Sequence, residues 1–378
     1  GGGAAFLILY VLIVVLVCLP VLIAEMVLGR STATSPLNAP VKAANNKWQL
    51  MGWLFVIAAS GILAFYAVLM GWTAHTLFHS LFVGLPADMD EAKIFFGRVS
   101  SGSSVLIGQL ISLLLTGLVV QAGIRKGIER LTKWCMPLLF FLLIALACWA
   151  ATLPGAWDGY RTFLLRWEWS QLFDPTTIRN AFTQAFFSIG TGIGCILAYS
   201  AYLDKRNKIP QEALAVVGMD TAVGLLAGMV TFPVVMSFGL KDVVSSSTVG
   251  TLFISLPTGL AVLGPTGRLV AVMFFALAYI AAITSSVSLL EVPVSSLIDR
   301  LGLKRGRAVW ISTSLIFVLG IPSATNLDVL GNMDAIFGGI LLIFGGLLLS
   351  LLLGWHLPNL FDQDLAYSGA STKLRRSL

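Results

Sequence analysis

The strongest indication of the fold is the segment Asn180-Ala-Phe-Thr-Gln-Ala-Phe-Phe-Ser-Ile-Gly-Thr-Gly-Ile-Gly194. It belongs to a long apolar region and places Gly190, Gly192 and Gly194 near the middle of that region. Each glycine weakens a helix interior by about 1 kcal/mol relative to alanine. Two interpretations stay open: the glycines let membrane helices pack closely, or the helix is discontinuous and its freed amides and carbonyls line a cavity. A nucleotide-binding loop is excluded, since no strand precedes the glycines.

The composition around this segment is that of a membrane protein. Of 378 residues, 57% are hydrophobic and 11% are charged, and the mean hydropathy is +0.90. Soluble domains carry about 25% charged residues. The apolar runs are roughly 18–25 residues long, enough to cross a bilayer as helices, and the alternation typical of β-barrel strands is missing. We therefore predict an all-α polytopic membrane protein.

The placement of charge sets the expected topology. Most of the 24 lysines and arginines fall in short connections on one side if residue 1 lies outside, and that side is expected to be cytoplasmic. The net charge of +6 therefore indicates orientation rather than binding to nucleic acid. We predict a transmembrane bundle over 1–355 and a cytoplasmic tail over 356–378. The nine predicted spans are about 5–28, 49–81, 103–122, 134–153, 180–203, 211–238, 268–297, 308–323 and 330–355.

The longest external connection, 239–267, is moderately apolar but is interrupted by prolines and glycines such as Pro257 and Gly264. We expect a lid folded onto the bundle rather than a tenth span, because an interrupted helix cannot satisfy its backbone in lipid.

Asp220 is an acidic residue near the middle of a predicted span, about 12–13 Å deep at 1.5 Å per residue. No lysine or arginine lies at that depth to pair with it. A carboxyl group there must be protonated, hydrogen-bonded or neutralised by a bound cation. A protonated structural aspartate and a cation site are both consistent with the sequence.

A third feature is the run Ala281-Ala-Ile-Thr-Ser-Ser-Val-Ser288. Ala281, Thr284, Ser285 and Ser288 share one helical face. Helix packing explains small residues, and hydroxyls can bond back to their own helix. A hard cation such as sodium also prefers oxygen ligands, so both interpretations stay open.

Other chemistry is weakly represented. His75 and His79 are spaced i, i+4, but the third histidine, His356, is expected on the opposite side of the membrane. We therefore expect no metal site other than sodium, and no organic cofactor. No Ser/His/Asp set, phosphate loop or carboxylate pair suggests an enzyme.

These features, in this order, resemble the neurotransmitter:sodium symporter family, whose bacterial members have the LeuT-type fold. The opening Gly1–Phe6, with Leu19-Pro20 and Ala24–Arg30, is similar to the second helix of that family. Phe182–Asp204 is similar to its broken sixth helix and Ala281–Leu290 to its eighth. The resemblance covers nearly the whole chain, and it implies a LeuT-type inverted-repeat bundle in the bacterial inner membrane.

The resemblance also implies a function, sodium-coupled symport of an amino acid by alternating access, with two sodium ions. The first ion would be held by Ser188 and Asp220, and the second by the Ala281 carbonyl with Thr284 and Ser285. An apolar pocket favours a hydrophobic or aromatic substrate. The residues implied for the substrate are Ile62, Tyr66, Phe187, Ile193, Ser285 and Leu289, and those for the gates are Asp334 outside and Asp299 with Tyr202 inside.

Two departures from the family pattern carry expectations of their own. Chloride-dependent relatives carry asparagine where this chain has Asp220, beside positions matching Tyr10, Gln184 and Ser188, so we expect chloride-independent transport. The first helix of the family would precede Gly1, and the chain would end after the tenth. We therefore expect a truncated chain that does not transport alone.

Two rival functions stay open: a proton-coupled amino-acid carrier, and a non-transporting membrane sensor or scaffold that retains the fold. Sodium-free uptake would identify the first, because a proton-coupled carrier needs no cation-binding hydroxyls. The identity of the amino acid and the oligomeric state are left undetermined by the sequence.

Overall fold

The computed structural model describes residues 3–86, 88–166, 169–240 and 248–367. All regular structure within these ranges is helical, in agreement with the predicted all-α class. Eight helical segments are long and apolar enough to cross a membrane. They are Gly3–Thr32, Asn46–Phe82, Gly102–Gln121, Ile124–Ala150, Ile209–Ser237, Gly264–Leu301, Arg305–Thr325 and Leu327–His356.

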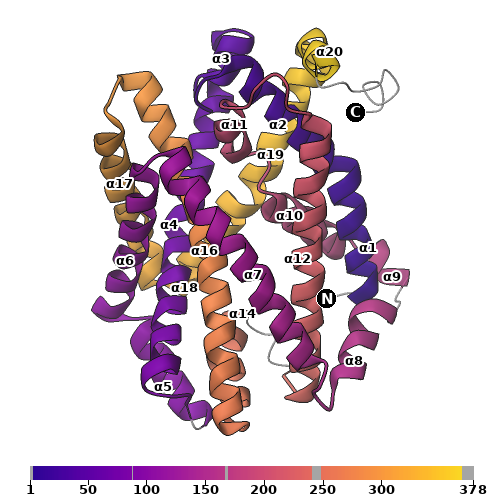
Figure 1. The fold of residues 1–378 in the computed structure, drawn as a ribbon, viewed down its shortest axis with the longest axis vertical. Helices are drawn as coiled ribbons and strands as arrows, with labels where there is room; N and C mark the ends of the chain where they lie inside the picture. Colours follow the sequence, from indigo (N-terminus) through magenta and orange to yellow (C-terminus); the bar gives the residue numbers. More distant parts are fainter. Residues whose placement is uncertain (1–2, 87, 167–168, 241–247, 368–378) are drawn as a thin grey trace.

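The long segments consist of α-helices, which Figure 1 labels where there is room, and of short π-helical or 3-10 turns. In the first segment and the last, π-helical turns link consecutive α-helices. The elements are α1 (Gly3–Ile13), η1 (Val14–Cys18), α2 (Leu19–Thr32), α4 (Gln49–Phe82), α6 (Gly102–Gln121), η3 (Ile124–Ile128), α7 (Glu129–Ala150), α12 (Ile209–Ser237), α16 (Gly264–Leu301), α17 (Arg305–Thr325), α18 (Leu327–Met333), η6 (Asp334–Ile340), α19 (Leu341–Ser350) and η7 (Leu351–His356).

Shorter helices fill the connections between the long segments. They are α3 (Ala39–Ala43), η2 (Asn46–Trp48), α5 (Met89–Val99), α8 (Ala156–Tyr160), η4 (Arg161–Leu165), α9 (Trp169–Leu172), α10 (Pro175–Ile189), α11 (Cys195–Ser200), α14 (Thr248–Gly250), η5 (Thr251–Ser255), α15 (Leu256–Ala261) and α20 (Pro358–Tyr367).

The predicted span 180–203 is the only one of the nine that does not form a continuous helix in the described structure. It consists of α10 and α11, separated by five residues that begin at Gly190. The other eight predicted spans coincide with the eight long segments, most of which extend a few residues beyond the prediction. The hydrophobic pattern therefore located the spans, and the glycines located the break.

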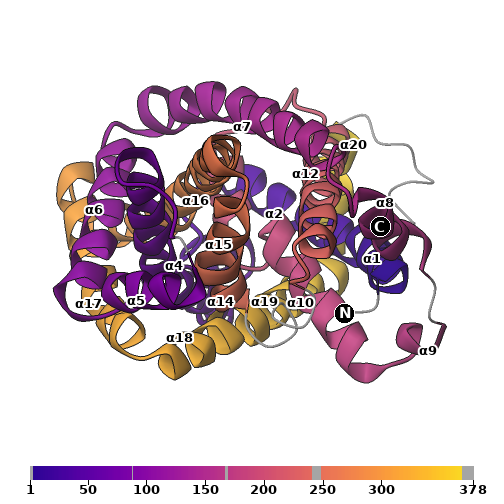
Figure 2. The ribbon, with the colours of Figure 1, turned by 90° about the horizontal axis from the view of Figure 1, so that it is seen from below.

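The centre of the bundle is made by α4 and α16, which pack against each other along their lengths (Figure 2). Helices α6 and α17 cover one flank of this pair, and α7 crosses another. Trp72 and Phe65 of α4 and Phe275 of α16 are fully buried there. Burial of such large apolar side chains holds the helices that carry the candidate site in fixed positions.

The connection predicted to be a lid folds onto the bundle over its described part. Phe253 is buried, and its ring centroid lies 5.9 Å from that of Trp72 and 5.5 Å from that of Phe96. Residues 248–261 form short helices that are too brief to cross a bilayer, as expected. The stretch 241–247 of this connection lies outside the described residues.

The segment predicted as a tail begins with α20, which lies at the same end of the bundle as α3 (Figure 1). Leu365 of α20 is completely buried, and α20 packs on the end of α2. The division of the chain at residue 355 stays a prediction, and residues 368–378 lie outside the described structure.

Candidate functional site

The break between α10 and α11 is the structural centre of the candidate site. Gly190, Gly192 and Gly194 have φ angles of +70°, +84° and +80°, in the left-handed region that glycine adopts without strain. A Cβ on Gly192 would lie 2.3 Å from the Leu342 carbonyl oxygen of α19. Both interpretations of the glycines therefore hold: they interrupt the helix, and they allow close packing.

The amides freed by the break are bound by a carboxylate that the sequence analysis missed. Glu25 of α2 is completely buried, and its Oε2 accepts a hydrogen bond from the Gly192 amide at 3.0 Å. Its Oε1 accepts from the Leu197 amide of α11 at 3.2 Å. An acidic residue near the end of the predicted span 5–28 was the available signal, and it was overlooked because it lies so close to the boundary.

On the other side of the break, three helices meet at Asp220 of α12. Its Oδ2 accepts hydrogen bonds from the Ser188 hydroxyl of α10 at 2.7 Å and from the Tyr10 hydroxyl of α1 at 3.1 Å. Gln184, one turn before Ser188, is exposed. The structure thus brings together Ser188 and Asp220, the two residues predicted for one sodium ion.

A cavity of about 200 Å³ lies directly beside the break. No lysine, arginine, aspartate or glutamate of the described chain lines it, and its polar groups are hydroxyls such as those of Tyr66 and Tyr199 together with the thiol of Cys195. Such a lining suits a solute whose side chain is uncharged. All the residues predicted to contact substrate line this one cavity: Ile62, Tyr66, Phe187, Ile193, Ser285 and Leu289.

The hydroxyl stripe of α16 borders the same cavity. The Thr284 hydroxyl donates to the Ala281 carbonyl at 2.8 Å, and the Tyr199 hydroxyl donates to Ser288 Oγ at 2.9 Å. Back-bonding to the helix is therefore real here, as the packing interpretation expected. A hydroxyl that donates a hydrogen bond still has two lone pairs, and a carbonyl oxygen that accepts one hydrogen bond still has a second lone pair. These oxygens can therefore also ligate a cation. Ser285, next to Thr284, reaches the cavity directly.

A second, wider hollow of about 920 Å³ meets the cavity at Tyr199, Ser285 and Ser288. It extends past Thr284 to Tyr202 at the end of α11. The side chains that line both therefore form a common wall between the cavity and the wider hollow.

The sequence profile of the Sodium:neurotransmitter symporter family matches residues 1–95 and 98–355 of this chain. The chain belongs to this family. It is therefore a multi-pass, sodium-dependent secondary transporter and not an enzyme, as the resemblance implied.

Individual relatives of this symporter come from distant organisms. The uncharacterized sodium-dependent transporter YhdH of Bacillus subtilis is 35% identical over 342 residues, which cover 89% of this chain and 74% of YhdH. Sodium-dependent nutrient amino acid transporter 1 of Drosophila grimshawi is 24% identical over 389 residues, which cover 86% of this chain and 60% of that transporter. The crystal structure of MhsT in complex with L-phenylalanine matches with a TM-score of 0.90 at 34% identity, covering 99% of this chain and 88% of MhsT. The predicted LeuT-type bundle is confirmed by this match.

The residues predicted as gates of the symporter are not among the described residues that line the cavity. Asp299, near the end of α16, accepts hydrogen bonds from the Thr34 hydroxyl at 2.7 Å and the Ser35 amide at 2.6 Å. Tyr202 is 67% exposed beyond the end of α11. Asp334 is exposed at the start of η6, on the last long segment. Their gating role stays a prediction.

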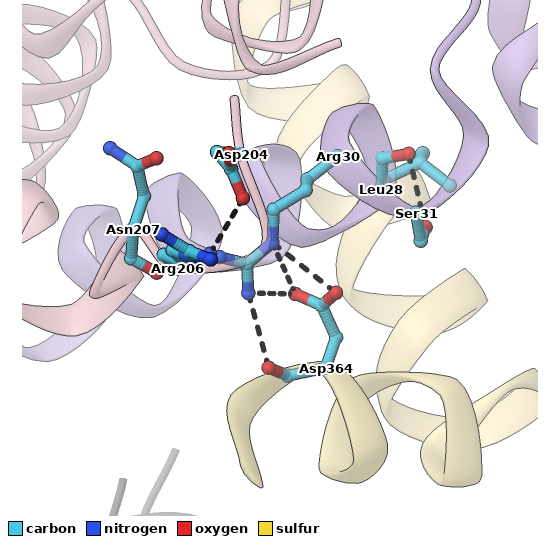
Figure 3. A network of polar contacts seen from close by, with 7 residues as sticks. All are labelled: Leu28, Arg30, Ser31, Asp204, Arg206, Asn207 and Asp364. Atoms are coloured by element: carbon cyan, nitrogen blue, oxygen red, sulfur yellow. Dashed lines mark hydrogen bonds and ion pairs between the residues drawn. The ribbon is translucent and has the colours of Figure 1, made fainter. Parts of the chain in front are cut away.

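Two charge networks near the gate residues were not foreseen from the sequence. Arg30 of α2 is buried; it donates from Nη2 to Asp364 Oδ2 of α20 at 2.6 Å and from Nη1 to the Asn207 carbonyl at 2.7 Å (Figure 3). Glu291 of α16 is also completely buried and pairs with Arg305 of α17. Arg30 and Asp364 are 334 residues apart, and Glu291 and Arg305 lie 14 residues apart on two different helices, so spacing alone gave no signal for either pair.

Proposed function

We propose that this protein is a sodium-coupled symporter of a neutral amino acid with a hydrophobic or aromatic side chain. The observation that carries the proposal is the uncharged cavity of about 200 Å³ beside the helix break, with predicted sodium ligands on two of its walls. Ser188 lines the cavity and also bonds to Asp220, while Ser285 lines it from α16. The likeness to MhsT, whose structure was determined with L-phenylalanine, supports an aromatic substrate.

Two sodium ions would bind against these walls. The first would be held by Ser188 and Asp220, and the second by the Ala281 carbonyl with the hydroxyls of Thr284 and Ser285. Each set offers the oxygen ligands that a hard cation prefers. The carbonyls freed at the break would accept from the substrate's amino group, and Tyr66 would donate to its carboxylate.

Coupling follows if the ions favour one state of the bundle and only the fully loaded site closes. The Asp220 carboxylate supplies fixed negative charge next to the first ion, which is the role that a bound anion would otherwise fill. We therefore propose transport that is independent of chloride. The protein would lie in the bacterial inner membrane, with the end that carries Arg30, Arg300 and α20 in the cytoplasm.

Uptake of radiolabelled phenylalanine into proteoliposomes containing the full-length protein tests the proposal. Uptake should require an inward sodium gradient and should be unchanged when gluconate replaces chloride. Uptake driven equally well by a proton gradient without sodium would favour the proton-coupled carrier instead. Sodium-dependent phenylalanine binding without uptake would contradict the proposed symport, and absence of both would favour the sensor or scaffold.

A further inference from the structure

A hollow distinct from the candidate site lies between the start of α4, the end of α16 and the start of α17. We call it the α4/α16/α17 groove. Its volume is about 350 Å³, and most of its lining is apolar. Trp53, Ile311 and Leu315 border it with 44%, 49% and 58% of their surfaces exposed. Large apolar side chains exposed on membrane-spanning helices face lipid, so the groove opens to the bilayer.

One end of the groove carries positive charge without a partner. Arg300 lines the groove at the end of α16. Lys304 immediately precedes α17, and Arg307 lies in its first turn. All three side chains are exposed, and none forms an ion pair or a side-chain hydrogen bond within the part of the chain that the structure describes.

The acidic groups on the same two helices form no ion pair with these cations in the described chain, and the single charge of Asp299 is outnumbered by the three cations. Asp299 accepts two hydrogen bonds from the connection that contains Thr34 and Ser35. Glu291 is buried deeper in α16 and is paired with Arg305. The mouth of the groove is therefore cationic, and this matches an anionic ligand that also has an apolar part.

A buried hydroxyl inside the groove points to the same ligand. Ser312 of α17 lines the groove and is 2% exposed, and its Oγ has no hydrogen-bond partner among the residues that the structure describes. Leaving such a hydroxyl unpaired costs free energy. Ser312 lies five residues beyond Arg307, about 7.5 Å along the helix at 1.5 Å per residue. A phospholipid carries its ester carbonyls just below its phosphate, so one lipid can reach both groups.

We propose that the α4/α16/α17 groove binds one anionic phospholipid. Its phosphate lies among Arg300, Lys304 and Arg307, an ester carbonyl accepts from the Ser312 hydroxyl, and an acyl chain lies along Trp53. A zwitterionic lipid carries its own cation beside the phosphate, so it gains less from three unpaired positive side chains.

The experiment uses the full-length protein in nanodiscs that contain phosphatidylglycerol or phosphatidylcholine with brominated acyl chains, which quench tryptophan fluorescence on contact. The difference between wild type and W53F isolates the signal of Trp53. We expect half-maximal quenching at a roughly five-fold lower mole fraction of the anionic lipid. R300Q should reduce this preference, whereas R130Q, which changes an exposed arginine at the start of α7, should leave it unchanged.

Equal quenching by the two lipids in the wild type would overturn the proposal, as would equal loss of preference in R300Q and R130Q. A Trp53 signal that no brominated lipid quenches would show that protein covers the groove, and this also contradicts it. Native mass spectrometry provides a second measurement: S312V should retain several-fold less phosphatidylglycerol than wild type at an unchanged melting temperature. Inorganic phosphate at millimolar concentration should not displace the lipid; displacement would show a site for free phosphate only.

Discussion

Replacing Asp220 by asparagine tests the electrostatic basis of the proposed sodium site. Asparagine keeps an oxygen that can accept from Ser188 and Tyr10, so the hydrogen bonds of 2.7 and 3.1 Å need not be lost and the fold should be retained. What disappears is the negative charge. A sodium ion bound to Ser188 Oγ lies within about 5 Å of the carboxylate, given a metal–oxygen distance of about 2.4 Å.

The size of the effect follows from that distance. At an effective dielectric constant of about 20, two unit charges about 5 Å apart attract by about 3 kcal/mol. That energy corresponds to roughly a hundredfold in affinity. We therefore expect D220N to bind sodium about a hundredfold more weakly than wild type in chloride-free buffer. Added chloride should recover at least tenfold of this loss, because an anion beside Tyr10 and Ser188 restores the missing charge.

Equilibrium binding of radiolabelled phenylalanine, titrated with sodium at constant ionic strength, measures this affinity in the purified full-length protein. The titration is run in gluconate and again in chloride, with wild type and D220N in parallel. Circular dichroism and melting temperature confirm that the variant is folded. A D220N sodium affinity within threefold of wild type in gluconate would refute the argument, since the carboxylate would then contribute no charge to the ion.

Three further predictions concern the break and its surroundings. G192A should abolish phenylalanine binding, because its Cβ would meet the Leu342 carbonyl oxygen at 2.3 Å in a left-handed backbone, while G218A, with open space around it, should bind normally in the same assay. E25Q should lower the melting temperature by a few degrees, since the amide nitrogen of glutamine would face a backbone N–H that now donates to a carboxylate oxygen. Hydrogen bonds from Thr177 hold the pKa of Asp174, which caps α10, below its usual range. A carboxyl group whose pKa is lowered by folding stabilises the fold while it is ionised, at pH values above its usual pKa of about 3.9, and this stabilisation is lost as the pH falls below that value. The difference in melting temperature between wild type and D174A should therefore be present at pH 7 and should shrink below about pH 4.

The spans were predictable because they depend on local sequence. A run of about 20 apolar residues crosses lipid whatever its neighbours are, and the glycines at 190–194 are costly wherever they lie in a helix. The apolar run of this segment predicts a helix and its glycines disfavour one, so a break was one of the two interpretations of the sequence. Packing contributed the other, and the 2.3 Å approach of Gly192 to α19 shows that one glycine can serve both purposes.

Contacts between distant segments were predictable only through the family resemblance. Ser188 and Asp220 are 32 residues apart, and no spacing rule joins them. The six positions that the resemblance implied for the substrate line one cavity, whereas those implied for the gates do not. The partners of Glu25 are backbone amides, which every residue but proline has, so no side-chain pattern indicates them. The pair of Arg30 with Asp364 spans 334 residues and had no local signal either.

Glu25 shows why the break cannot be understood from α10 and α11 alone. In lipid, every freed amide needs a partner from the protein, since water does not supply one. Glu25 accepts from amides on both sides of the break's last glycine, at Gly192 and at Leu197, and so fixes the position of α11 relative to the gap. Gly29, one turn further along α2, packs against the Leu197 carbonyl, where a Cβ would approach to 2.6 Å. The shape of the cavity is therefore set in part by α2, a helix that does not line it. Substitutions in α2 should alter solute binding even though the substituted residues do not contact the solute.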